Sequence, residues 1–126
     1  MYLRFVTTRI DKDSNKPQGV FVAAYSVLDS GDLTADEWSR IREILNWFEK
    51  HLPPPPKDFS ACKAIFWFKS SARESIGQIW ELVEMLRHHG HYVEVHKCRR
   101  LANIRYQDYL QVAAYPSELD GRITVQ

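Results

Sequence analysis

Apolar and polar positions between residues 63 and 98 predict a strand, a helix and a second strand. Residues 64–68 form a short, aromatic-rich run between two lysines, which is typical of a buried strand. Apolar side chains then recur at helical steps of three and four, at Ile76, Ile79, Trp80, Val83 and Leu86. Residues 92–96 return to alternation. The pattern predicts a βαβ unit whose two strands are parallel neighbours.

The predicted helix has signals at both ends. Ser71 and Glu74 have the spacing of a capping box, so we expect Ser71 to be the N-cap. Gly90 follows two histidines, and glycine adopts the left-handed conformation that commonly ends a helix. Gly77 costs about 1 kcal/mol relative to alanine inside a helix. We therefore interpret Gly77 as a point where a neighbouring element comes close.

The first thirty residues predict a strand and then a helix. Residues 2–10 alternate as a strand, with Leu3 and Phe5 on one side and the intervening residues on the other. Residues 19–30 fit either a helix or a strand. Helical spacing of their apolar positions, followed by Asp-Ser-Gly at 29–31, favours the helix.

A second helix is predicted from a capping box at Thr34 and Glu37. Its apolar stripe runs from Trp38 to Leu52, and the four prolines at 53–56 end it. Those prolines are interpreted as a rigid spacer that returns the chain to the next strand, rather than as a ligand for another protein.

The C-terminal region leaves two alternatives open. Residues 103–115 alternate as one long bent strand or as a hairpin that turns near residues 107–108. Residues 117–126 form either an edge strand after an Asp-Gly turn or a fraying tail. The whole chain, residues 1–126, is predicted to be a single α/β (α+β) domain. We expect a mixed sheet of four or five strands with three helices, in the order β-α-α-β-α-β-β.

Composition narrows the class of protein. The 126 residues are 44% hydrophobic and 26% charged, which is typical of a globular domain. We expect no membrane span, because no apolar run approaches about 20 residues. We expect no signal peptide, because residues 1–6 are not a charged region followed by an apolar stretch. Cys62 and Cys98 fit reduced thiols in a cytoplasmic protein better than a disulfide. The net charge of +1 gives no global electrostatic case for binding nucleic acid.

Several of these segments also resemble a group of small bacterial proteins to which no activity is assigned. The resemblance is carried by segments 1–7, 19–21, 29–31, 47–48, 52–53, 106–108 and 111–113. It covers most of the chain. It implies a bacterial setting and nothing about mechanism.

The first candidate site is the predicted start of the helix at residues 69–73. Lys69, Ser70, Ser71 and Arg73 place hydroxyls and cations where free N–H groups and the helix dipole favour an anion. The segment lacks the glycine-rich loop of nucleotide-binding folds. A solvated helix cap is the simpler interpretation.

A second basic group comprises Lys97, Arg99, Arg100 and Arg105. Together with the helix start, it makes a nucleic-acid or phosphate-ligand binding protein the alternative function. Binding to phosphates would weaken steeply as salt is added.

Metal binding and nucleophilic catalysis are weaker alternatives. The residues that could ligate a metal are His88, His89, His91, His96 and Cys98. Their spacing matches no standard zinc signature, so no metal, cofactor or catalytic residue is predicted. Either cysteine could be combined with a histidine and Asp108 in a triad. No motif such as a nucleophile elbow supports that arrangement.

The remaining candidate is a surface for another protein. Aromatic residues make up 13% of the chain, more than a single core readily places. If the helices cover one face of the sheet, its other face would present aromatic and basic side chains typical of interfaces, namely Tyr2, Arg4, Trp67, Tyr106 and Tyr109. The preferred prediction is therefore a small non-catalytic binding or adaptor protein. Its partner would be another protein or a second copy in a homodimer.

Overall fold

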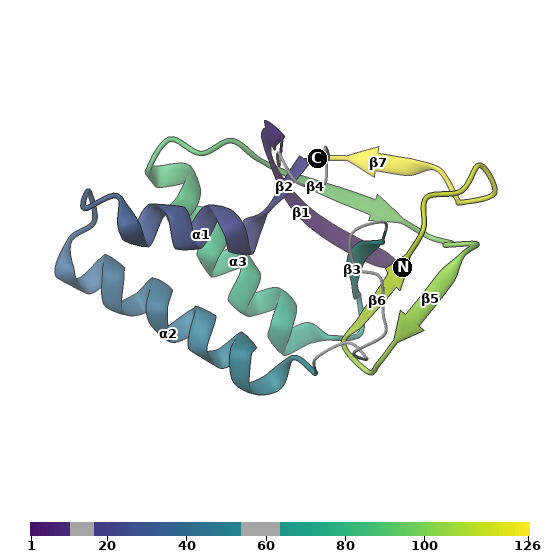
Figure 1. Ribbon diagram of the computed structural model, residues 1–126, viewed down its shortest axis with the longest axis horizontal. Coiled ribbons are helices and arrows are strands. Elements are labelled where there is room, and N and C mark those ends of the chain that lie inside the picture. The colour runs from purple at the N-terminus through teal and green to yellow at the C-terminus, as the bar shows by residue number, and fades with distance from the viewer. Residues whose placement is uncertain (11–16, 54–63) are drawn as a thin grey trace.

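The computed structural model describes residues 1–10, 17–53 and 64–126 and shows an α+β fold. The helices are α1 (Val20–Asp29), α2 (Ala35–His51) and α3 (Arg73–His88). The strands are β1 (Tyr2–Ile10), β2 (Pro17–Gly19), β3 (Ile65–Lys69), β4 (Val93–Cys98), β5 (Ile104–Gln107), β6 (Gln111–Ala114) and β7 (Ile123–Val125). All three helices lie together on one side of the sheet (Figure 1).

The predicted pair of parallel neighbours is wrong. The described strands form a seven-stranded sheet, rather than one of four or five strands, in the order β5-β6-β3-β1-β4-β7, with β2 paired to β1. β1 lies between β3 and β4 and is antiparallel to both. These two strands therefore run in the same direction without touching, and α3 carries the chain across β1. All pairings among the described strands are antiparallel.

Two apolar clusters lie on opposite faces of the sheet. The helix-covered face holds the larger cluster, in which Phe5, Phe68 and Val95 of the sheet meet buried residues of all three helices. The smaller cluster lies on the other face, which we call the second face. It contains Trp67, Cys98, Leu101, Val112 and Ala114, with Tyr2, Ile65 and Ile104 packed against them. The second face is therefore partly filled by the protein's own side chains.

The helix ends confirm one predicted cap and contradict another. Thr34 caps α2 in a reciprocal capping box with Glu37, and α2 ends before Pro53 as expected. The N-cap of α3 is Ala72 rather than Ser71, and among the described residues no side chain caps this helix. Gly90 adopts a φ of 85°, the left-handed conformation that ends a helix.

Two open alternatives and one interpretation are settled by the backbone. Residues 103–115 contain a hairpin, β5 and β6, instead of one long strand. The C-terminal segment forms an edge strand, β7, paired to β4. The interpretation of Gly77 as a close approach is wrong, because an added Cβ there would meet no described residue within 4 Å. In the described parts of the chain, every helix is too short or too polar to cross a bilayer.

Candidate functional site

The outer edge of β7 is an end of the sheet to which another chain could bind. Backbone bonds of 3.0 and 2.9 Å join Val95 and Gln126 in both directions. Hydrogen-bonded residues alternate along an antiparallel pair. The N–H and C=O groups of Ile123 and Val125 therefore point away from β4, toward the outer edge. No strand among the described residues pairs with that edge.

The side chains of this edge strand extend the second face into solvent. Ile123 lies opposite Cys98, and Val125 lies opposite His96. Directly paired residues share a face, so both side chains lie on the second face. Ile123 is 46% exposed and Val125 is 53% exposed. They form an apolar margin beyond the smaller cluster.

Two further rows of the second face lead to this margin. Tyr2 pairs with Cys98 and Arg4 pairs with His96, so each row runs from β1 through β4 to β7. Both β1 side chains are half-buried. Burial lowers the pKa of the Arg4 guanidinium below its ordinary value. The rows combine an aromatic ring and a cation with the apolar side chains of β7.

The predicted partner residues are only partly brought together. Trp67 is 4% exposed, so its ring belongs to the smaller cluster and is not presented to a partner. Tyr106 donates its hydroxyl to Asp108 over 2.9 Å, which raises the pKa of Tyr106. Tyr109 is 67% exposed, but its hydroxyl donates to the carbonyl of His51. Of the predicted residues, Tyr2 and Arg4 lie nearest to the open edge.

Asp108 organises the turn between β5 and β6. Its carboxylate accepts hydrogen bonds of 2.9 and 3.0 Å from the backbone N–H groups of Leu110 and Gln111. Burial raises the pKa of Asp108, but these bonds and those from Tyr106 and the Gln111 side chain outweigh it and leave that pKa lowered. The arrangement is that of a structural turn, and the triad considered from the sequence has no support in these contacts.

The predicted basic group is divided between β4, β5 and the segment that joins them. Lys97 lies on β4, and Arg105 lies on β5, which is separated from β4 by β6, β3 and β1. Arg100 donates to the carbonyl of Leu119 over 2.8 Å, and the Arg105 guanidinium lies 5.0 Å from the centre of the Tyr115 ring. Arg99 is exposed. Two of these cations are thus engaged in local contacts.

At the predicted anion site, some backbone N–H groups already donate hydrogen bonds within the turn. Lys69 is half-buried, and Ser70, Ser71 and Arg73 are exposed at the turn between β3 and α3. The N–H of Ala72 donates to the Lys69 carbonyl, and that of Arg73 donates to the Ser71 carbonyl, each over 2.9 Å. These turn bonds use donors that an anion would need.

The predicted metal ligands are dispersed. His89 contacts Glu37 at 2.6 Å, and His96 contacts Glu94 at 3.2 Å. The Cys98 thiol donates to the Arg100 carbonyl over 3.1 Å. His88 is exposed and His91 is half-buried. Within the described ranges no three His, Cys, Asp or Glu side chains converge on a metal position. Cys62 lies outside the described residues.

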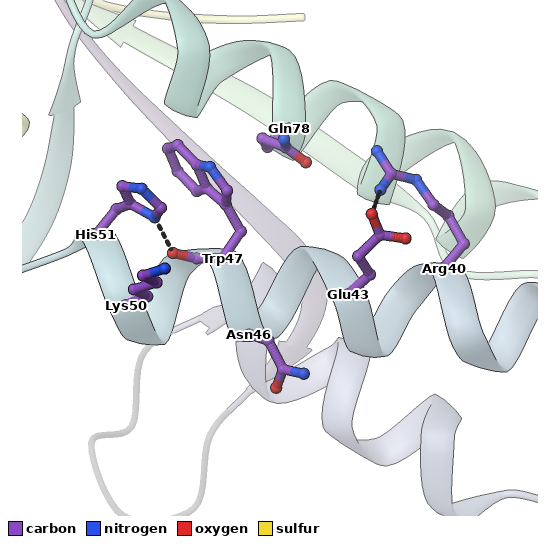
Figure 2. Close-up of a pocket in the computed structure, with 7 residues that line it drawn as sticks. All are labelled: Arg40, Glu43, Asn46, Trp47, Lys50, His51 and Gln78. Carbon is purple, nitrogen blue, oxygen red and sulfur yellow. Dashed lines mark hydrogen bonds and ion pairs between the residues drawn. The ribbon is translucent and has the colours of Figure 1, made fainter.

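A groove between α2 and α3 was not expected from the sequence (Figure 2). Its volume is about 240 Å³, and its lining residues are Arg40, Glu43, Asn46, Trp47, Lys50, His51 and Gln78. Trp47 stacks on His51 with ring centres 4.3 Å apart, and Arg40 pairs with Glu43 and Glu81. Small-molecule sites usually exceed about 300 Å³. The groove is better explained as the polar margin of helix packing.

The sequence offered one weak signal for the open edge. Ile-Thr-Val after an Asp-Gly turn is a β-forming run, but local alternation does not reveal whether a strand is central or at an edge. Comparisons of the chain with protein-family models, curated proteins and solved structures find no match. A function is therefore inferred from the arrangement of β7, β4 and β1.

Proposed function

We propose that this protein is a non-catalytic binding protein that adds another polypeptide strand to the outer edge of β7. One observation carries the proposal. β7 combines outward-pointing backbone groups with two half-exposed β-branched side chains, Ile123 and Val125. An added strand would satisfy those backbone groups, and alternate side chains would supply specificity.

The second face supports the same conclusion. Tyr2 and Arg4 lie in rows that lead to β7, and tyrosine and arginine are enriched in protein interfaces. An incoming side chain on this face would extend the smaller cluster across the edge. The partner favoured by this chemistry is an extended segment with apolar residues at every second position.

The test compares two valines of similar exposure. Val125 is 53% exposed on β7, and Val22 is 49% exposed on α1. We expect Val125→Lys to abolish capture of a partner from the native host and Val22→Lys to leave it unchanged. The captured chain is then purified, and its affinities for the wild type, Val125→Lys and Val22→Lys are measured directly.

Equal losses in both variants, or no loss in Val125→Lys, would contradict the proposal. A salt series separates it from the alternative. Affinity for a strand should change little between 50 and 200 mM salt, whereas a phosphate binder would lose several orders of magnitude, roughly 10³-fold or more. A steep salt dependence with bound nucleic acid would favour the alternative function.

A further inference from the structure

We infer that the strand which occupies the β7 edge belongs to a second copy of this protein, paired antiparallel about a twofold axis beside Thr124. The inference rests on the proposed function, because it names the partner of the same edge. A closed dimer places identical surfaces against each other. Two identical strands related by such an axis can meet at their edges only in antiparallel orientation.

The hydrogen-bonding pattern selects one register. The outward backbone groups belong to Ile123 and Val125, with Thr124 midway between them. If Ile123 lies opposite Val125 of the second copy, every outward N–H meets an outward C=O in both directions. The twofold axis then passes beside Thr124. The two sheets become one continuous antiparallel sheet.

Side chains in this register are complementary to themselves. Ile123 would contact Val125 of the second copy, and the reverse contact follows from symmetry. The half-exposed apolar side chains of both copies would merge into one cluster on the second face. On the other face, the two Thr124 side chains would form a closely spaced pair, and Thr–Thr cross-strand pairs are favourable.

The opposite edge of the sheet is less suited to pairing. β5 contains an irregular register between Ile104 and Tyr106 and an exposed cation, Arg105. Bulges and charges of this kind protect an edge strand from added strands. The pairing of β7 with β4 has no such irregularity. A contact between β7 of one copy and β5 of another would leave an unpaired edge at both ends of the assembly. Further copies could then add to those edges and build a filament.

The charge of the chain permits self-association. Its net charge is +1, so two copies repel each other weakly at neutral pH. The short edge strand predicts a modest affinity, because three residues supply few intermolecular contacts. We therefore expect a monomer–dimer equilibrium that depends on concentration.

Amide hydrogen exchange of the intact protein tests the register. The N–H groups of Ile123 and Val125 should exchange rapidly in dilute samples and slowly in concentrated ones. The Gln126 N–H, bonded to the Val95 carbonyl over 2.9 Å, is a control within the same segment and should change much less. Rapid exchange of both outward amides at every concentration would overturn the inference.

Sedimentation equilibrium under reducing conditions tests the partner. Val125→Pro removes an outward donor and leaves the bonds between Val95 and Gln126 in place, whereas Val125→Thr keeps the donor. We expect the dimer dissociation constant to rise about 30-fold in Val125→Pro, because half of the intermolecular bonds are lost. A smaller change is expected in Val125→Thr. Equal circular dichroism spectra and melting temperatures establish that both variants are folded.

The outcomes separate this inference from the proposed function. A wild-type protein that remains at the monomer mass of 14.8 kDa overturns the inference. If Val125→Lys still abolishes capture of a different chain, the proposed function stands. A dimer that forms equally well in Val125→Pro also overturns the inference, because its contact must then lie elsewhere.

Discussion

Tyr109 donates its phenolic hydroxyl to the backbone carbonyl of His51, 3.2 Å away and 58 positions earlier in the chain. Beside it, the Gln111 side-chain amide donates to the carbonyl of Pro53 over 3.2 Å. The last carbonyls of a helix lack donors within that helix. The hairpin of β5 and β6 therefore supplies donors to the end of α2 and to the residue just beyond its C-cap, which ties the hairpin to the helical layer.

This relationship predicts the effect of Tyr109→Phe. The variant keeps the ring and removes the hydroxyl, so we expect a loss of about 0.5–1 kcal/mol in the free energy of unfolding. Urea denaturation measures the loss. Tyr92→Phe is the control, because Tyr92 is 63% exposed and its hydroxyl has no partner among the described residues. Equal effects of the two substitutions would show that the bond to His51 contributes nothing.

The starts of α2 and α3 predict different losses of stability when a hydroxyl residue is replaced by alanine. Thr34 accepts a hydrogen bond from the Glu37 N–H over 3.2 Å, so Thr34→Ala should lower the free energy of unfolding by about 1 kcal/mol. Ser71 is exposed and caps nothing, so Ser71→Ala should change it by less than about 0.5 kcal/mol. Thermal denaturation of both variants is the measurement. A large loss in Ser71→Ala would contradict the structure and would indicate that Ser71 is the N-cap of α3, as expected from the sequence.

Gly77 predicts a stabilising substitution. It is exposed in the interior of α3, and an added Cβ would meet nothing within 4 Å in the part of the chain that the structure describes. Gly77→Ala should raise the free energy of unfolding by about 0.5–1 kcal/mol, since alanine has the higher helix propensity. Gly90→Ala is the matched control and should be destabilising, because Gly90 has a φ of 85°. A destabilised Gly77→Ala would mean that α3 has a closer neighbour than the structure shows.

Local patterns of the sequence predicted the elements better than their arrangement. The apolar stripes of α2 and α3 are properties of neighbouring residues, and the structure buries Ile41, Ile44, Ile79 and Leu86 as those stripes require. The order of strands, in contrast, is not a property of neighbouring residues. No pattern between residues 64 and 96 predicts that β1 lies between β3 and β4.

A clearer sign of the arrangement lay in β1 itself. Phe5, Val6 and Thr7 are consecutive and all buried, as expected for a central strand covered on both faces. Alternation was the pattern expected there instead. The candidate site was hidden for a related reason. Ile123 and Val125 look like core residues in sequence, and only the position of β7 at the margin of the sheet exposes them.

The contact between α2 and α3 predicts a dependence of stability on pH. Glu37 accepts a hydrogen bond from the Thr34 N–H over 3.0 Å and contacts the His89 ring at 2.6 Å. The Thr34 bond and then the His89 contact lower the pKa of Glu37 from its ordinary 4.5 to about 2. The unfolded chain therefore takes up a proton at this carboxylate at a higher pH than the folded chain does.

The direction of the change in stability with pH follows from the lower pKa of Glu37 in the folded chain. The contribution of Glu37 to stability is complete above about pH 4.5 and is lost as the pH falls toward about 2. Glu37→Gln cannot lose a charge, so its unfolding free energy should fall less steeply over this window. The difference between wild type and Glu37→Gln should be constant above about pH 4.5 and should shrink as the pH falls toward about 2. Glu84→Gln, whose side chain is 72% exposed, is the control and should follow the wild-type slope closely. Parallel pH profiles for wild type and Glu37→Gln would show that the carboxylate charge does not stabilise the junction of α2 and α3.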